Sequence, residues 1–287
     1  MTDATYDSHG PRYADAGSSL TRGAVALFGA CYDGTTSFRP GARSGPDALR
    51  TASLGIETYS PDQKSTTTDD IDLVDLGNLH LPAGAPAPVV DTVTWATREI
   101  LAADAKPLLV GGEHSVSIGA IRAHAEYYSN LTLIQFDAHA DLRDEYRGHR
   151  CNHACVMRRA LEVVPSQRVH QVGIRSGTRR EFDELAETDR LVASSADELA
   201  ERLDGSSGPV YLTVDLDVFD PAYVPGTGTP EPGGIDWPTF AGLLAAIDDR
   251  RLVAADVVEL APSLDPTGRS SVLAAKAVRE IALKLGN

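Results

Sequence analysis

The chain has 287 residues, of which 42% are hydrophobic and 23% charged, as in a globular protein with a substantial core. Its formal net charge of −15 argues against nucleic acid as a partner, because binding a phosphate backbone requires basic patches. There is no apolar run long enough to span a membrane and no signal-peptide pattern in the first 20 residues, and three cysteines do not make a disulfide framework. We therefore expect a soluble, reduced, cytoplasmic protein that does not bind membranes.

Residues 1–20 are interpreted as a flexible arm or packing extension, followed by one domain over residues 21–287. Short β-rich apolar runs predict strands, and stretches with helical spacing of apolar residues predict helices between them. The strands are expected at 24–33, 71–77, 106–110, 131–137, 169–174, 209–217 and 252–260. The helices are expected at 45–53, 89–103, between Gly112 and Tyr128, and at 153–164, 236–249 and 270–285. This alternation predicts an α/β fold with a parallel sheet covered on both faces.

Metal-binding types of side chain follow three of these strands, at the ends where ligands bind in open parallel sheets. In FDAHAD and VDLD these side chains stand at alternate positions, which keeps them on one face for as long as strand geometry lasts. The candidate metal ligands are His114, Asp137, His139, Asp141, Asp215 and Asp217. We expect them to line one shared site.

Two divalent cations are expected at this site, because four carboxylates carry too much negative charge for one ion. Oxygen-rich ligation with some imidazole suits manganese better than it suits a thiol-rich zinc site. A pair of such ions can hold a bridging water and lower its pKa until it becomes hydroxide near neutral pH. The sequence thus predicts two Mn²⁺ ions per chain and hydrolysis by a metal-bridging hydroxide.

Each motif also has an ordinary structural explanation when it is taken alone. An Asp-x-Asp at a strand end is usually a turn or a helix cap, and Ser115 of GGEHS could cap a helix. HRCNHAC at 149–155 interleaves histidines with cysteines as a zinc site could, but no second cysteine pair follows it. Cys151 and Cys155 are therefore expected to be packing residues. Three motifs that all stand at strand ends favour the metal site.

The sequence resembles the ureohydrolases, the family that includes arginase and agmatinase. GGEHS, DAHAD, DLDVFDP and VVELAPSLDP match motifs of that family in order and in rough spacing. SFRPGARSGPDALR at 37–50 is similar to the family's N-terminal signature, and the likeness runs from about residue 22 to residue 284. It implies a three-layer α/β/α fold with a mostly parallel central sheet, a binuclear manganese centre at the six positions above, and release of urea from a guanidino group.

The resemblance also implies catalytic roles for His153 and Glu259. His153 matches the family histidine that passes protons near the leaving amine, a role that suits imidazole near neutral pH. Glu259 matches the acid that grips the substrate guanidinium, whose donor fork a carboxylate accepts in bidentate fashion. His149 competes for the proton role, and His153 is preferred on the family spacing.

Agmatine is the expected substrate, hydrolysed to putrescine and urea as in polyamine biosynthesis. The stretches at 141–148, 173–178 and 225–234 resemble the agmatinase branch, and Leu-Ala-Pro follows Glu259 where arginases commonly have Val-Asn-Pro. Arginine and guanidinobutyrate share the reacting end of agmatine, so an arginase or a guanidinobutyrase remains an alternative. The loop after Asp141 contains both acids and arginines and does not decide between them.

Two other classes of protein remain open. A zinc-dependent amidohydrolase or deacetylase has a similar fold and an Asp-His-Asp arrangement, but its single metal would leave His114 unexplained. A non-catalytic member would be expected if a ligand or Glu259 had been lost, and none has been. The resemblance further implies a homo-oligomer, trimer or hexamer, that acts on a small cationic guanidine.

Overall fold

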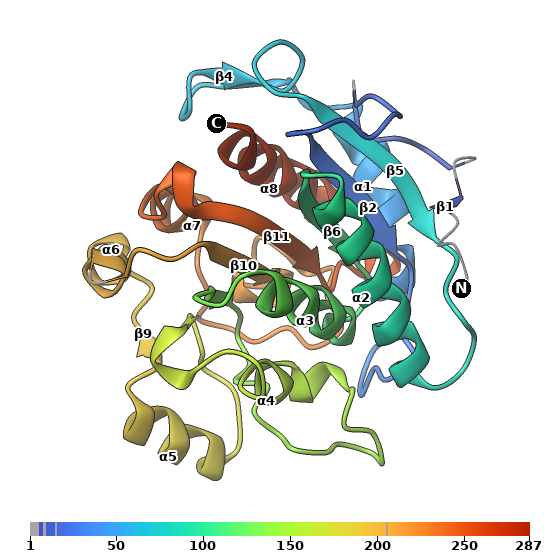
Figure 1. Ribbon diagram of the computed structural model, residues 1–287. Coiled ribbons are helices and arrows are strands. Elements are labelled where there is room, and N and C mark those ends of the chain that lie inside the picture. The colour runs from blue at the N-terminus through green and yellow to red at the C-terminus, as the bar shows by residue number, and fades with distance from the viewer. Residues whose placement is uncertain (1–5, 8–9, 15, 205) are drawn as a thin grey trace.

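A nine-stranded sheet forms the centre of the computed structural model, which describes residues 6–7, 10–14, 16–204 and 206–287 (Figure 1). Its strands are β1 (Tyr6–Asp7), β2 (Val25–Ala30), β5 (Leu73–Leu79), β6 (Lys106–Gly111), β7 (Thr132–Phe136), β8 (Val169–Val172), β9 (Leu191–Val192), β10 (Val210–Asp215) and β11 (Leu252–Val258). They lie in the order β1-β5-β2-β6-β11-β10-β7-β8-β9. Every neighbouring pair is parallel except β1 with β5. A separate hairpin pairs β3 (Tyr59–Ser60) with β4 (Ser65–Thr66).

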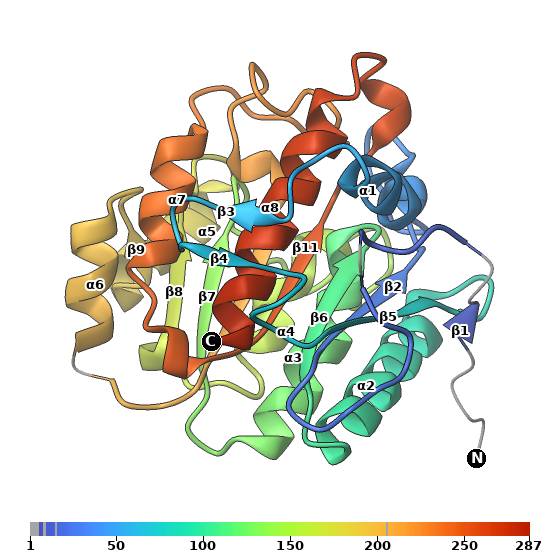
Figure 2. The ribbon, with the colours of Figure 1, turned by 90° about the horizontal axis from the view of Figure 1, so that it is seen from above.

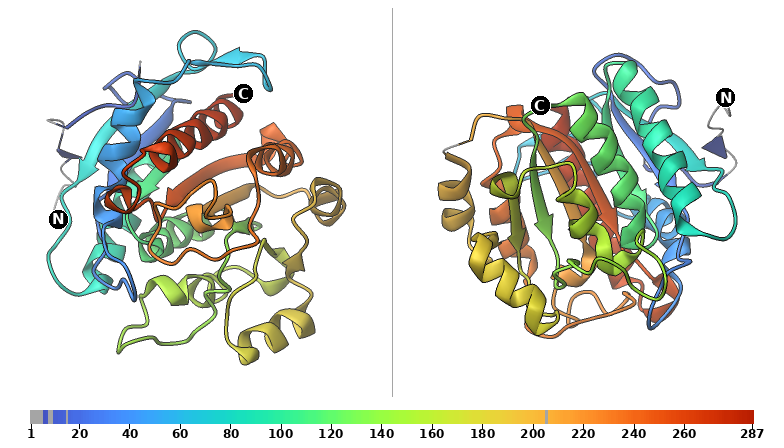
Figure 3. Two further views of the ribbon diagram at one scale, coloured as in Figure 1. Left: turned by 180° about the vertical axis from the view of Figure 1, so that it is seen from behind. Right: turned by 60° about the horizontal axis from the view of Figure 1, so that its bottom comes forward.

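Helices cover both faces of this sheet. One face packs against α1 (Gly45–Ser53), α6 (Ala196–Asp204), α7 (Trp237–Ala245) and α8 (Arg269–Gly286), which lie in front of the strands in Figure 2. The other face packs against α2 (Pro86–Ala102), α3 (Ser117–Tyr127), α4 (Val156–Ala160) and α5 (Arg179–Thr188). These four helices face the viewer in the right-hand panel of Figure 3. The expected three-layer α/β/α class with a mostly parallel sheet is confirmed.

The apolar strands are explained by this double cover. Strands β2, β7 and β10 are buried at every position, as strands with helices on both faces must be. Successive side chains enter opposite layers: Leu27 packs in the core with α1 and α8, whereas Phe28 packs in the core with α2 and α3. The two layers together bury the hydrophobic residues on which the sequence-based strand predictions depend.

Several elements differ from the sequence-based expectations. The predicted strand at 209–217 ends at Asp215, and Asp217 lies in a short 3-10 turn instead. The predicted helix at 153–164 shortens to α4, with a 3-10 turn at His153–Cys155 before it. The helices α5 and α6 were not predicted, although Thr178 and Glu181 form a capping box at the start of α5, a recognisable helix signal.

The predicted N-terminal arm falls partly outside the described residues, which omit 1–5, 8, 9 and 15. Within the described part, Tyr6–Asp7 pairs with β5. Tyr13 is buried; its backbone N–H donates to Asp75 and its hydroxyl donates to the carbonyl of Ala275, both at 2.8 Å. These residues therefore pack on the domain. In the described part of the chain, no helix combines the length and the apolar character that crossing a membrane requires.

Candidate metal centre and substrate pocket

Four neighbouring strands of the sheet bring the polar motifs together. Strands β6, β11, β10 and β7 are consecutive in the sheet, and all four are parallel. His114 follows β6, Glu259 follows β11, Asp215 is the last residue of β10, and Asp137 directly follows β7. Because the carboxyl ends of parallel strands meet at one edge of a sheet, segments far apart in the chain converge there.

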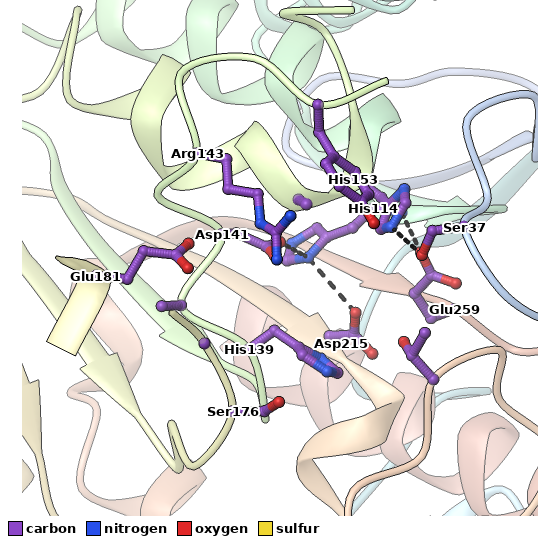
Figure 4. A pocket seen from close by; sticks show the side chains of 15 residues that line it. Ser37, His114, His139, Asp141, Arg143, His153, Ser176, Glu181, Asp215 and Glu259 are labelled. Atoms are coloured by element: carbon purple, nitrogen blue, oxygen red, sulfur yellow. Dashed lines mark hydrogen bonds and ion pairs between the residues drawn. The ribbon is translucent and has the colours of Figure 1, made fainter. Parts of the chain in front are cut away.

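The first of two side-chain groups contains His114, Asp137 and Asp141, whose ligand atoms all lie within 4.8 Å of one another. His114 Nδ1 is 3.1 Å from Oδ2 of Asp137 and 3.1 Å from Oδ2 of Asp141. Oδ2 of Asp215 is 3.5 Å from the same nitrogen, and Figure 4 shows these two residues facing each other. Three carboxylates therefore surround one imidazole nitrogen.

The other side of the His114 ring determines what this nitrogen can do. Its Nε2 lies 2.9 Å from the hydroxyl oxygen of Thr213, which in turn donates to Asp256 at 2.6 Å. Since the single hydroxyl proton of Thr213 goes to Asp256, the hydroxyl oxygen accepts from His114 Nε2–H. In the neutral ring, Nδ1 then keeps its lone pair, and this buried atom has no hydrogen-bond partner among the described residues. A buried lone pair aimed at carboxylates is what a metal ligand presents when its other nitrogen is held in this way.

The second group contains Asp137, His139 and Asp217 and lies beside the first. His139 Nδ1 is 2.9 Å from Oδ2 of Asp217 and 3.7 Å from Oδ1 of Asp137. Asp137 belongs to both groups, one oxygen facing His114 and the other facing His139. Two groups that share a carboxylate could hold two cations side by side.

The carboxylates of this cluster are almost completely buried. Burial, together with neighbouring carboxylates, raises the pKa of Asp137, that of Asp141 to about 7, and that of Asp215 well above its usual range. Asp217 is the exception: burial raises its pKa, but the charge and hydrogen bond of His139 together with the backbone N–H of Ala138 lower the pKa overall. Buried carboxylates at such close range require cationic partners in order to stay ionised. The donor set therefore fits divalent cations.

A pocket of about 240 Å³ opens over the cluster (Figure 4). Glu259 lines it from the sheet side, where one carboxylate oxygen accepts the backbone N–H of His114 at 2.8 Å. Burial and the nearby Glu113 raise the pKa of Glu259 to about 8. Glu259 and Asp141 both have left-handed backbones, with φ of 67° and 51°. Such strain in non-glycine residues is typical of functional sites.

His153 faces the pocket from the 3-10 turn that precedes α4. Its Nε2 lies 3.1 Å from the hydroxyl oxygen of Ser37, and its Nδ1 lies 3.3 Å from that of Thr35. Burial is the largest cause that lowers the pKa of His153, to about 4. The rival candidate His149 is exposed and does not line this pocket.

Cys151 and Cys155, which were expected to be packing residues, belong to neither of the two side-chain groups. Cys155 is buried and Cys151 is half-buried. Among the described residues, the groups able to hold a metal ion include neither of them. The pocket also contains Arg143, from the loop after Asp141 that was expected near the substrate tail, and side chains to which the sequence gave no role there: Ser37, Tyr146, Ser176, Glu181 and Thr229. Several of them stand in stretches that resemble family motifs, so these stretches were the available signal.

Comparisons with known proteins agree with this geometry. The model of the arginase family matches residues 23–284. The chain is 37% identical to an agmatinase of Halalkalibacterium halodurans, over 93% of each protein. It is 35% identical to proclavaminate amidinohydrolase of Streptomyces clavuligerus, over 96% of this chain and 95% of that protein. The solved structure of the agmatine ureohydrolase of Thermoplasma volcanium superposes with a TM-score of 0.86 at 33% identity, covering 95% of this chain and 93% of that one.

Family, fold and the converging polar residues thus agree over nearly the whole chain. The chain belongs to the arginase family, and it is an agmatinase-type ureohydrolase, an enzyme that acts on guanidino substrates.

Proposed function

We propose that the enzyme hydrolyses agmatine to putrescine and urea with two Mn²⁺ ions bound per chain. The proposed ligands are His114, Asp137, His139, Asp141, Asp215 and Asp217. The observation that carries the proposal is the pair of side-chain groups that share Asp137. Six donors, four of them carboxylates and none a thiol, match the preference of manganese. When bound, the two metal ions would supply hydroxide as a nucleophile at neutral pH.

The side chains around the pocket would then orient the substrate. Glu259 is held by the backbone of His114 and is placed to accept the N–H groups of a guanidinium. His153 lines the same pocket and is placed to deliver a proton to the departing amine, which must leave in neutral or protonated form. These roles place the reacting carbon between Glu259 and the cluster, and the tail of the substrate toward the pocket mouth.

The tail end of the pocket supports a second candidate substrate class. Arg143 lines the pocket, its guanidinium stacks on the Tyr146 ring at 4.2 Å, and it makes no ion pair with any described residue. A free cation at this position favours a carboxylate-bearing guanidine such as guanidinobutyrate or arginine. Agmatine, whose tail is an amine, is supported by the agmatinase relatives.

A urea assay with agmatine, arginine and guanidinobutyrate tests the proposal, with metal content measured on the same sample. We expect the manganese-loaded enzyme to release urea fastest from agmatine and to contain two ions per chain. Faster release from arginine or guanidinobutyrate would assign the enzyme to that substrate. A single bound metal without urea release would favour the zinc amidohydrolase alternative.

We also propose that the enzyme is a cytoplasmic homo-oligomer, a trimer or a hexamer. Sedimentation of the purified chain tests its assembly, and a monomer at working concentration would contradict it. Fractionation of the source cells tests its location.

A further inference from the structure

Glu113 is a fully buried carboxylate that belongs to neither metal group. It accepts hydrogen bonds from the backbone N–H of Thr35 at 2.8 Å, from the Thr35 hydroxyl at 2.5 Å, from the Ser115 hydroxyl at 2.6 Å and from the Thr36 hydroxyl at 3.3 Å. Three of these four donors lie in the loop after β2. A buried acid with this many partners fixes the position of the loop that reaches it.

Thr35 connects this carboxylate to His153. The Thr35 side chain is buried, and its hydroxyl oxygen accepts the backbone N–H of His153 at 3.1 Å. The same oxygen lies 3.3 Å from His153 Nδ1, while Ser37 meets Nε2 on the far side of the ring. The loop after β2 therefore contacts both ring nitrogens of His153. These two contacts fix the orientation of the imidazole ring.

The direction of these hydrogen bonds follows from the number of protons. The Thr35 hydroxyl has one proton, and its contact with Glu113 is much shorter than its contact with His153 Nδ1. With that proton donated to Glu113, the hydroxyl oxygen can only accept, so the ring proton must be on Nδ1. Nε2 then has the unprotonated lone pair, which accepts from the Ser37 hydroxyl; both residues line the pocket.

We infer that Glu113, acting through Thr35, is a positioning residue that holds His153 in the tautomer protonated on Nδ1. In that tautomer Nε2 is the atom that takes up a proton and passes it to the leaving amine. The inference rests on the proposed role of His153 in guanidine hydrolysis. Neither Glu113 nor Thr35 has to touch the substrate.

The first test is the nitrogen NMR spectrum of histidine-labelled full-length enzyme, loaded with a diamagnetic divalent ion so that manganese does not broaden the signals. The His153 signals are assigned by their loss in H153Q. We expect the wild-type ring to carry its proton on Nδ1. A proton on Nε2 would overturn the inference. This readout needs no substrate, so it stands even if no guanidine is hydrolysed.

The second test compares Thr35→Val with Thr36→Val, two isosteric changes in the same loop. Both hydroxyls contact Glu113, but only that of Thr35 contacts His153. We expect T35V to mix the tautomers and to lower kcat about ten- to a hundredfold with little change in KM, the usual range for a supporting residue. Thr35→Ser, which restores the hydroxyl, should recover most of the loss.

Glu113→Gln provides the third comparison, since the amide can donate to Thr35 and reverse the relay. We expect it to shift the His153 proton toward Nε2 while the bound metal content is unchanged. If T35V and T36V behave alike, or if T35V alters KM and metal content but not the tautomer, the relay has only a structural role and the inference fails.

Discussion

Two histidines that line the pocket, His114 and His153, are held by the same arrangement of hydrogen bonds in two different settings. His114 meets Thr213, whose proton goes to the buried Asp256, and both partners lie in adjacent strands of the sheet. His153 meets Thr35, whose proton goes to the buried Glu113, but these partners lie in loops. The metal centre is therefore supported by the sheet, whereas the proton-transfer side of the pocket is supported by loops. Substitutions should separate the two: changes on the sheet side should remove metal, and changes on the loop side should slow the chemistry alone.

The largest effect is expected from Asp137→Asn, because Asp137 belongs to both side-chain groups. We expect metal content and activity to fall together, with a rate loss of about 10³-fold or more, the equivalent of several kcal/mol of transition-state stabilisation. Elemental analysis and urea release on one sample measure both. Asp197→Asn, an exposed acid on α6, is the control. A D137N enzyme that keeps two ions would break the comparison.

His153→Asn should act on the chemistry while the metal stays bound. We expect kcat to fall about 10²- to 10⁴-fold, the range for losing a general acid, with an unchanged metal content. His149→Asn is a matched control four residues away, because His149 is exposed and lies outside the pocket. Equal losses in the two variants would remove His153 from its role.

Metal removal should lower stability in a pH-dependent way. Burial raises the pKa of Asp141 to about 7 in the metal-free fold, so the folded chain binds more protons there than the unfolded chain does. The protonated Asp141 therefore contributes to the free energy of unfolding of the metal-free protein at low pH, and this contribution is lost as pH rises from about 4 to 7. Bound cations instead favour the ionised carboxylate. We expect the difference in Tm between metal-loaded and chelated protein to widen over that interval. Calorimetry would contradict this if the difference were constant or became smaller.

The smallest effect is expected from Arg143→Gln at the tail end of the pocket. If the substrate tail is the amine of agmatine, losing the cation should lower its KM about two- to fivefold, the range for a partly exposed charge pair. For guanidinobutyrate the KM should rise by a similar factor. Arg147→Gln is the control, because Arg147 also lies over the Tyr146 ring but does not line the pocket. No change with either substrate would place the tail elsewhere.

The sheet-borne half of the site could be predicted because its residues follow long apolar strands. Asp137 and Asp215 are expected at strand ends from the sequence, and both lie there in the structure. The expected alternation of side chains along a strand does not hold beyond these two positions, because β7 ends at Phe136 and Asp217 lies in a 3-10 turn. Alternation along a strand does not continue through these turns, so a left-handed backbone at Asp141 and local turns bring the side chains together.

The loop-borne half could not be predicted in the same way. The contacts of Thr35 and Ser37 with His153 span more than a hundred residues and depend on how two irregular loops cross. No periodicity reports such contacts, and only the resemblance to a family motif drew attention to His153. The missed strand β9 is two residues long, too short to give a pattern, whereas the capping box of α5 was a readable signal.

Gly112 lies where the metal side of the site and the loop that holds His153 meet. A methyl group at this position would lie 1.9 Å from the carbonyl oxygen of Tyr32, so the backbones after β6 and β2 touch directly. The next two residues are Glu113, which anchors the loop around His153, and His114, which faces the carboxylate cluster. The backbone contact between Gly112 and Tyr32 thus lies next to the segments that position both histidines. Even a methyl group there would displace the backbone on which both histidines depend, so a substitution of Gly112 should disturb both at once.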